Sequence, residues 1–299
     1  MIAIFGPTGI GKTAVAVALA QRLRAAGEDP IAISADALQV YEGLELLTGT
    51  ASRAEQAALE HRLLSFLPVD ATFSVGQYAQ LAHAEIDGAV AARRRPIVVG
   101  GTGLYLRAAL TDLKLKPPPP EGVREHWEGE LARRGAPALH AELARRAPWA
   151  ASGIDPNDRQ RIVRAHELLD AGELEPPEGP SQLWTDEVRH PTLLAGLVME
   201  REALYARIDA RVEAMVAAGA REEVLRAHAA GASETARKAL GFEELLTGDI
   251  EAMQRRTRNY ARRQLTWMRK LAGVSTIDVT DRSAEEVAAE IEAIGSAAA

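Results

Sequence analysis

Residues 6–13 read Gly6-Pro7-Thr8-Gly9-Ile10-Gly11-Lys12-Thr13, which matches the Walker A pattern of a phosphate-binding loop. The apolar run Ile2–Phe5 precedes the loop and predicts a buried strand. The segment Ala14–Arg24 follows it and predicts a helix, because it contains neither Gly nor Pro. In that setting the glycines let backbone N–H groups converge on a phosphate, and the helix N-terminus adds its positive dipole end. We therefore expect a di- or triphosphate ligand; the alternative is a chance glycine turn, which both flanks argue against.

Two further apolar runs indicate the fold class. Ile31–Ser34 and Pro96–Val99 repeat the strand pattern, and the second run ends in Gly100-Gly101. Short buried strands that alternate with helical stretches predict an α/β protein with a parallel sheet. With the phosphate loop after the first strand, we expect a P-loop NTPase-like core.

The catalytic acid of this core is the less obvious part. An ordinary P-loop ATPase needs an acid at the end of a core strand, but the run Pro96–Val99 is followed by Gly100-Gly101-Thr102 instead. Asp36 comes just after Ile31–Ser34, where its carboxylate would face the phosphate crevice at the carboxyl end of the strand. Small-molecule kinases also place an acid there. A plain N-cap or turn role for Asp36 remains the alternative.

Prolines mark an insertion in the middle of the chain. Lys116–Pro120 contains four successive prolines, and Pro176, Pro177, Pro180 and Pro191 stand on its far side. Three helical patterns lie between these borders: Arg124–Arg134, Ala138–Arg146 and Asp158–Ala171. We predict a discontinuous catalytic core of residues 1–115 and 191–299, and a helical insertion domain of residues 116–190.

The rest of the core is predicted to be mostly helical. Helical patterns cover Glu202–Ala217, Glu222–Ala229, Gly241–Leu246 and Ile250–Lys270. Val274–Val279 predicts a strand, and the Ala-rich tail predicts either a surface helix or a frayed end.

Composition excludes several classes of protein. The chain has 299 residues, of which 47% are hydrophobic and 26% charged, as is usual for a folded protein. The absence of cysteine excludes a disulfide scaffold, a thiol nucleophile and a Cys-ligated zinc finger. No run of about 18 apolar residues and no secretion signal is present, so we expect a cytoplasmic protein that does not bind a membrane.

Charge is unevenly distributed. The net charge is −7, so a nucleic-acid partner would need a local basic surface. Such a surface is predicted between Ala252 and Ile277, a segment without Asp or Glu. Its basic residues are Arg255, Arg256, Arg258, Arg262, Arg263, Arg269 and Lys270.

Further motifs follow one another in a fixed order. They are Ser34-Ala35-Asp36-Ala37-Leu38-Gln39-Val40-Tyr41, Gly49-Thr50-Ala51, His61-Arg62-Leu63-Leu64, Val99-Gly100-Gly101-Thr102-Gly103-Leu104-Tyr105, Asp155-Pro156-Asn157-Asp158, Leu240-Gly241-Phe242 and Tyr260-Ala261-Arg262-Arg263-Gln264-Leu265-Thr266-Trp267. With this series the chain resembles the bacterial tRNA dimethylallyltransferase family over nearly its whole length.

The resemblance implies transfer of a dimethylallyl group from dimethylallyl diphosphate to N6 of the adenosine immediately 3′ of the anticodon in tRNAs, with release of diphosphate. The P-loop then holds the diphosphate together with Arg207, and Mg²⁺ on Thr13 is the expected cofactor. Asp36 is implied as the general base. Thr102 is implied as a hydroxyl at the reacting centre, with closure of the Gly-Gly turn as the alternative, and Arg211 as a contact of the diphosphate. For Arg207 a solvated charged face is the alternative.

The resemblance also implies a tRNA partner, gripped at its anticodon stem-loop by the insertion, and a target adenosine flipped into a channel. The tRNA-contacting positions that it implies are Asp36, Ala37, Leu38, Gln39, Thr102, Arg124, Gln160, Arg161, Ile162, Val163, Arg164, Lys238, Ala239, Leu240, Gly241, Phe242 and Glu243. Tyr260 and Trp267 either stack on bases or pack in the protein, and we favour packing. We expect a monomer.

Two residues depart from the family pattern. Ala37 stands where the family usually has serine, and Phe242 stands where tyrosine is common. Each loses one hydroxyl, so the departures bear on contacts with RNA rather than on the P-loop.

Three other functions compete with this interpretation. A small-molecule kinase that uses ATP would fit the P-loop and Asp36, but it would leave the basic segment unexplained. A prenyltransferase acting on free adenine nucleotides would not need the insertion. An RNA-binding module with a structural P-loop would not need Lys12, Thr13 and Asp36 together.

Overall fold

The computed structural model describes residues 1–176, 179 and 181–297. Its chain contacts divide it into two units, Met1–Leu113 with Gln182–Ala299, and Lys114–Ser181. The predicted insertion extended to residue 190, whereas residues 182–190 lie in the first unit. Pro177 and Pro180, used above as border residues, lie outside the described residues.

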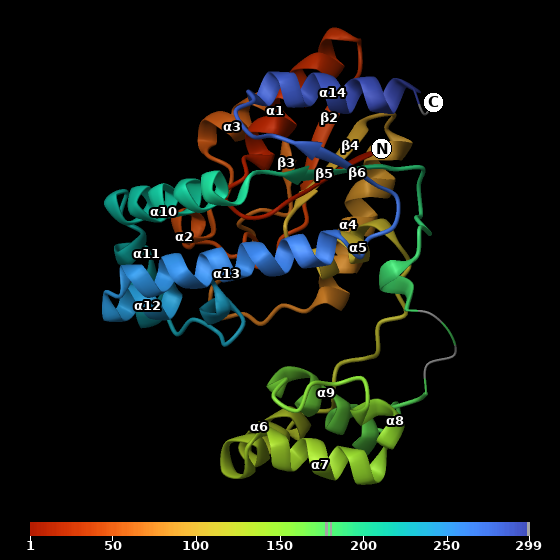
Figure 1. Cartoon of the computed structure of the whole chain (residues 1–299), viewed down its shortest axis with the longest axis vertical. Coiled ribbons are helices and arrows are strands. Elements are labelled where there is room, and N and C mark those ends of the chain that lie inside the picture. The colour runs from red at the N-terminus through yellow and green to blue at the C-terminus, as the bar shows by residue number, and fades with distance from the viewer. Residues whose placement is uncertain (177–178, 180, 298–299) are drawn as a thin grey trace. The chain divides into compact units, whose positions relative to one another are not determined.

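The first unit is built on a parallel sheet, so the predicted α/β fold is confirmed (Figure 1). The described residues form six strands in the order β3-β2-β4-β1-β5-β6, with every neighbouring pair parallel. They are β1 (Ile2–Phe5), β2 (Pro30–Ser34), β3 (His61–Arg62), β4 (Arg95–Gly100), β5 (Leu193–Val198) and β6 (Val274–Asp278). The sequence analysis did not predict β3, which has only two residues, or β5, whose apolar run contains Gly196.

Alternate side chains of each strand enter different cores, as the strand period of two requires. Ile4 and Ile97 belong to one apolar cluster, while Phe5 and Val98 belong to the other. Because both faces are covered, the strands are apolar on both sides, which is the reason that they appear in the sequence as continuous apolar runs.

Helices cover both faces of this sheet (Figure 1). Residues of α1 (Lys12–Ala25) and α14 (Ala284–Ala297) supply one apolar cluster, and residues of α4 (Val75–Ala91) and α5 (Gly103–Leu110) supply the other. The remaining helices of this unit are α2 (Glu45–Thr48), α3 (Arg53–Ala58), α10 (Arg201–Ala217), α11 (Ala220–Ala229), α12 (Phe242–Thr247) and α13 (Ile250–Met268).

Of the two alternatives predicted for the Ala-rich tail, the structure shows the surface helix. It forms α14, which packs along α1 and buries Val287, Ala288 and Ile291. Arg22 of α1 adds ion pairs to Glu285 and Glu292.

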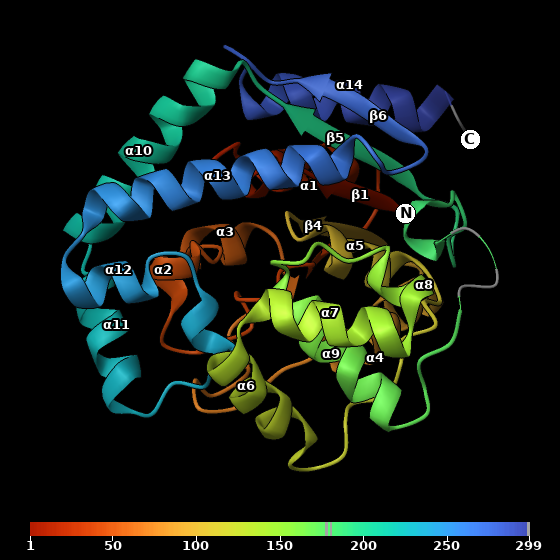
Figure 2. The ribbon, with the colours of Figure 1, turned by 60° about the horizontal axis from the view of Figure 1, so that its bottom comes forward.

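The second unit is a small helical domain (Figure 2). It contains α6 (Val123–Arg134), α7 (Ala136–Arg146), α8 (Pro148–Ala151) and α9 (Arg159–Asp170). Its core is organised by Trp127, whose ring stacks on His166 at a centroid distance of 4.1 Å and whose Nε1 donates to Asp170 at 2.8 Å. No helix in the described ranges is long and apolar enough to cross a membrane.

Candidate active site

The candidate catalytic residues lie where three neighbouring strands end. The P-loop follows β1, Asp36 follows β2, and Thr102 follows β4. Since these strands are parallel and adjacent, their carboxyl ends meet at one edge of the sheet, which is where ligands bind in open α/β folds. The structure therefore brings together the residues that the sequence analysis took from separate segments.

The P-loop has the backbone conformation that its glycines allow. Gly9 and Gly11 have φ values of 81° and 99°, in a region that other residues rarely adopt. A Cβ at Gly9 would also lie only 2.9 Å from Cγ1 of Ile208. These glycines are thus required both by the turn and by the close approach of α10.

The side chain of Lys12 bends back over the P-loop. Its Nζ donates to the carbonyl oxygens of Gly6 at 2.9 Å and Pro7 at 3.0 Å. Burial lowers the pKa of Lys12 to about 8, an effect that the negative charge of Asp36 opposes and the positive charge of Arg211 reinforces. The three charged groups therefore influence one another across the site.

Asp36 combines a turn role with a free carboxylate oxygen. Its Oδ1 accepts the N–H of Leu38 at 3.0 Å, which fixes the turn after β2. No hydrogen bond between described residues engages Oδ2. The turn role considered above is thus real, and it holds the carboxylate in place while one oxygen stays available for a ligand.

Gln39 is occupied within the protein. Its Oε1 accepts from Ser34 Oγ at 3.1 Å, and its Nε2 donates to the carbonyl oxygens of Thr48 at 3.4 Å and Gly49 at 3.2 Å. These bonds tie the end of α2 to the end of β2. A base edge would have to compete with them for the amide.

Thr102 is paired with an aromatic residue of α13. Its Oγ1 lies 3.2 Å from the hydroxyl oxygen of Tyr260. Burial raises the pKa of Tyr260 to about 12, and the charge of Asp36 adds to the effect, so the phenol stays protonated at neutral pH. Packing was favoured above for Tyr260, and the structure shows that its hydroxyl also reaches the candidate site.

Two arginines of α10 approach the same edge. Arg207 and Arg211 are one helical turn apart, so they share a face. A Cβ built at Gly11 would lie 3.2 Å from a terminal nitrogen of Arg207, which brings that guanidinium close to the P-loop. Arg211 donates to the carbonyl oxygen of Gly49 at 3.4 Å, and burial lowers its pKa below the ordinary arginine value. An arginine with a lowered pKa is still charged at neutral pH.

Gln264 is a site residue that the sequence analysis named only as part of a motif. It lies on α13, is only 4% exposed, and contacts both the P-loop and the turn before Thr102. Nothing local in the sequence distinguishes this glutamine from any other.

The residues present fit a magnesium ion that arrives with a phosphate ligand. Among the described residues no group of three or more His, Cys, Asp or Glu side chains could hold a metal. Mg²⁺ in phosphate sites is commonly held by one or two protein oxygens, the phosphates and water. The Thr13 hydroxyl, at the first turn of α1 and without a hydrogen bond to the described residues, can supply such an oxygen.

The expected tRNA contacts of the first unit differ in exposure. Lys238 and Glu243 are exposed, and Leu240 is partly exposed. Ala239, Gly241 and Phe242 are buried, so these positions offer RNA almost no surface. The Phe242 ring is fully buried with the guanidinium of Arg237 over it at 5.2 Å.

The expected tRNA contacts of the second unit differ in the same way. Arg161 is exposed, with a side-chain exposure of 67%, and lies 3.6 Å from Asp158. Arg124 and Arg164 instead both form 2.9 Å ion pairs with the fully buried Glu167. Gln160 is exposed, whereas Ile162 and Val163 form part of the core of this unit.

The basic segment falls on one surface of α13. Arg256 and Arg258 pair with acidic neighbours, Glu244 and Asp209. By contrast, three exposed arginines have no carboxylate within ion-pair distance in the described part of the chain. They are Arg262, Arg263 and Arg269.

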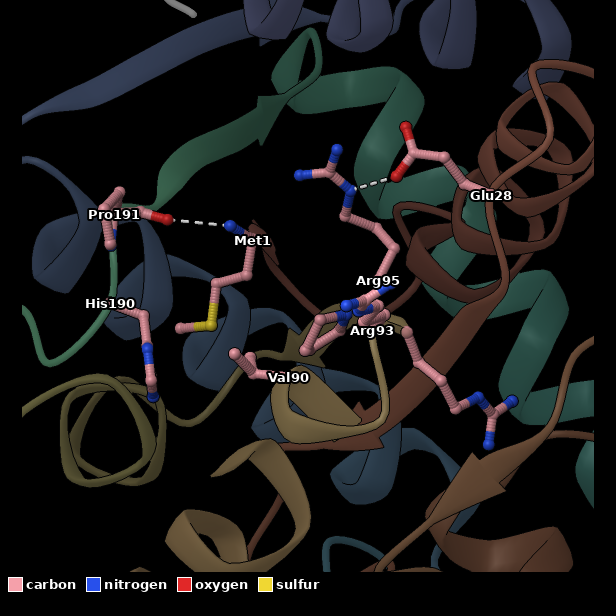
Figure 3. A pocket seen from close by; sticks show the side chains of 9 residues that line it. Met1, Glu28, Val90, Arg93, Arg95, His190 and Pro191 are labelled. Atoms are coloured by element: carbon pink, nitrogen blue, oxygen red, sulfur yellow. Dashed lines mark hydrogen bonds and ion pairs between the residues drawn. The ribbon is translucent and has the colours of Figure 1, made fainter. Parts of the chain in front are cut away.

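A separate cavity lies at the other edge of the sheet (Figure 3). Its volume is about 340 Å³, and it is lined by residues that precede or begin strands, including Glu28, Arg95 and His190. Arg95 pairs with Glu28, and His190 bonds to Asp87 at 2.7 Å. It contains none of the candidate catalytic residues.

Comparison with known proteins connects this site to a family. The sequence model of the family described as IPP transferase matches residues 39–271. A tRNA dimethylallyltransferase of Kineococcus radiotolerans is 41% identical over 295 residues, which are 95% of this chain and 92% of the relative. One of Anaeromyxobacter dehalogenans is 43% identical over 289 residues, which are 92% of this chain and 93% of the relative.

Solved structures of similar proteins support the same family assignment. The crystal structure of the tRNA isopentenylpyrophosphate transferase from Bacillus halodurans matches with a TM-score of 0.71 and 32% identity, covering 99% of this chain and 95% of that one. A eukaryotic dimethylallyltransferase acting on tRNA shares the fold, with a TM-score of 0.74 at 23% identity, covering 98% of this chain and 77% of that one. With its P-loop, its Asp36 and these relatives, the chain belongs to the IPP transferase family.

Proposed function

We propose that this protein transfers a dimethylallyl group from dimethylallyl diphosphate to N6 of the adenosine immediately 3′ of the anticodon in tRNAs, and releases diphosphate. Family membership supports the transferred group and the class of acceptor. The main structural support for the proposed reaction is that the P-loop, Asp36 and Thr102 lie together at one edge of the sheet. One side of that site suits an anionic leaving group, and the other offers a base to the acceptor.

The P-loop is proposed to hold the diphosphate. As the bond from carbon 1 to the diphosphate oxygen breaks, negative charge builds on the leaving group. Lys12, the N–H groups of the loop and the guanidinium groups of Arg207 and Arg211 would stabilise that charge. Bound Mg²⁺ would neutralise part of it, with Thr13 as its protein ligand.

Asp36 is proposed to act on the acceptor. The N6 amine attacks carbon 1 and must lose a proton as the new C–N bond forms. Oδ2 of Asp36 is free to take that proton, while Oδ1 keeps the carboxylate oriented through Leu38. Thr102, held by Tyr260, would donate a hydrogen bond to a phosphate or substrate oxygen.

Recognition of tRNA is proposed to use local basic surfaces, since the net charge is −7. Arg262 and Arg263 on α13, with Arg269 directly after it, form one such surface, and they have no competing carboxylates among the described residues. Arg161 on α9 is proposed as the contact of the second unit because its side chain is 67% exposed, and RNA would compete with Asp158, 3.6 Å away, for its charge. Base flipping would bring the target adenosine to Asp36.

Labelled dimethylallyl diphosphate, supplied with unmodified tRNA, AMP or ATP as rival acceptors, tests this function. Mass spectrometry of the nucleosides should show a gain in mass at one adenosine of the tRNA, at the position 3′ of the anticodon. Modification of AMP or ATP instead would favour the free-nucleotide prenyltransferase. Phosphoryl transfer from ATP without any prenylation would favour the kinase.

A further inference from the structure

One face of α13 lies against the loops at the carboxyl edge of the sheet. Tyr260 reaches Thr102, Gln264 reaches the P-loop, and Trp267 lies against Gly103. Residues three and four apart share one side of a helix, so a single helical face makes all of these contacts. Arg262 and Arg263, between Tyr260 and Gln264 in the sequence, and Arg269, directly after the helix, are exposed.

Gln264 joins two loops through the two ends of its amide. Its Oε1 accepts the N–H of Thr8 at 2.8 Å, and its Nε2 donates to the carbonyl oxygen of Gly101 at 2.7 Å. Only one orientation of the amide satisfies both partners. Thr8 belongs to the P-loop, and Gly101 directly precedes Thr102, so one buried side chain connects the phosphate loop with the turn that carries the candidate hydroxyl.

The glycines of the turn are explained by this contact. A Cβ at Gly101 would lie 2.3 Å from Nε2 of Gln264 and 3.2 Å from Nζ of Lys12. A Cβ at Gly103 would lie 2.3 Å from the ring of Trp267. The turn therefore needs glycine because α13 approaches so closely, independently of any phosphate.

We propose that Gln264 is a positioning residue for the diphosphate donor. Its amide sets the separation between the P-loop and the Thr102 turn, so that both act on the same ligand. This inference rests on the proposed function, since it takes the ligand of the P-loop to be a diphosphate. Glutamine is suited to the task because it donates at one end and accepts at the other. Glutamate would direct a carboxylate oxygen at the Gly101 carbonyl, and methionine would bond to neither loop.

The test compares Gln264→Met and Gln264→Glu with Gln254→Met. Gln254 lies on the same helix, and its side chain donates to Glu213 at 3.5 Å, its one hydrogen bond to the described residues. Calorimetry measures the Kd for inorganic diphosphate with Mg²⁺, and filter binding measures the Kd for tRNA. Gln264→Met should weaken diphosphate binding about tenfold, as expected for two lost hydrogen bonds. Gln264→Glu should weaken it as well, because it can still accept the N–H of Thr8 but places a carboxylate oxygen against the Gly101 carbonyl. Binding of tRNA should stay within about twofold, and the Gln254 variant should bind both ligands like the native protein.

A second variant approaches the contact from the other side. Gly101→Ala would displace the amide of Gln264, and it should weaken diphosphate binding similarly while tRNA binding persists. Folded Gln264 variants that bind diphosphate like the native protein would overturn the inference. Failure of these variants to fold would also overturn it, because Gln264 would then be a residue of the folding core. If the native protein itself does not bind diphosphate, the proposed donor site fails, which is a different result.

Discussion

The hydroxyl groups of Tyr260 and Thr102 face each other at 3.2 Å across the junction between α13 and the turn after β4. Because the pKa of Tyr260 is raised to about 12, the phenol keeps its proton and can donate to Thr102. The Thr102 hydroxyl is then free to donate its own proton to a ligand. Tyr260, more than one hundred positions away in the sequence, therefore holds the Thr102 hydroxyl through a hydrogen bond in which either oxygen can be the donor.

Tyr260→Phe should lower kcat about fivefold, since it removes one hydrogen bond that orients Thr102 and leaves the ring in place. The KM for tRNA should change little. Steady-state kinetics measure both values. Tyr205→Phe, which removes a phenol from α10 away from Thr102, is the control and should match the native protein. If the Tyr260 variant has the same kcat as the native protein, Tyr260 does not contribute to the reaction.

Asp36→Asn should lower the single-turnover rate by about 10²–10⁴, because the amide cannot accept the proton of the amine. The amide oxygen can still accept the N–H of Leu38, so the turn should persist and the Kd for tRNA should stay within a few-fold. Rapid-quench measurements with saturating tRNA give the rate. A variant that transfers at near the native rate would exclude Asp36 as the base.

The affinity for inorganic diphosphate should fall as pH rises through about 8, the pKa to which burial brings Lys12. The sign follows from the charge: below this pH the ammonium group is present and attracts the anion, and above it the group becomes neutral. Lys12→Arg keeps its charge throughout this range and should flatten the dependence between pH 7 and 9. Calorimetry in matched buffers measures the Kd values. The same slope in both proteins would assign the dependence to the ligand.

Thr13→Ala should blunt the Mg²⁺ dependence of transfer, since it removes the proposed protein ligand of the metal. Titration of activity with Mg²⁺ should show a higher half-saturating concentration, while tRNA binding without the donor stays unchanged. An unaltered titration would mean that the metal, if required, is held by the substrate alone.

Arg161 and Arg164 should respond differently to neutralisation. Arg161→Gln should reduce the log–log salt slope of tRNA binding by roughly 0.7 to 0.9 without changing Tm, because the side chain is exposed. Arg164→Gln should cost about 1–3 kcal/mol of stability, since Arg164 neutralises the buried Glu167 and bonds to the carbonyl oxygen of Lys116. Melting curves and salt titrations distinguish the two effects.

Arg133 supplies the matched control for that comparison. It lies in the same unit with a side-chain exposure of 68%, and Arg133→Gln should alter neither tRNA binding nor Tm by much. If Arg161→Gln leaves the salt slope unchanged in a folded protein, α9 does not contact RNA through this residue.

Sequence reasoning located the residues whose chemistry is local. The P-loop, Asp36 and Thr102 each follow a short apolar run, and parallel strands bring such ends together. Gln264 could not be found in this way, because its two partners are 256 and 163 positions away along the chain. Such a contact depends on how α13 crosses the sheet edge, which no local pattern encodes.

The Ala-rich tail and α9 show the same limit of local patterns. The Ala-rich tail predicts either a surface helix or a frayed end, and only the packing of Val287, Ala288 and Ile291 on α1 decides for the helix. The sequence pattern of α9 does not reveal that Arg164 forms an ion pair with the buried Glu167, three residues later. The pattern of charged residues shows which face of a helix is polar. Which ion pairs these residues form depends on how the side chains of that helix and its neighbours are packed.

The packing of α14 on α1 has a practical consequence for handling this protein. Removal of the residues from Ala284 onward would expose to water the apolar surface of α1 that Val287 and Ile291 cover. It would also remove the carboxylates that pair with Arg22. The N-terminus of α1 is also the end of the P-loop, so the damage would reach the phosphate site through the helix. Affinity tags and fusion partners should therefore follow α14 through a flexible spacer, so that this helix stays packed on α1.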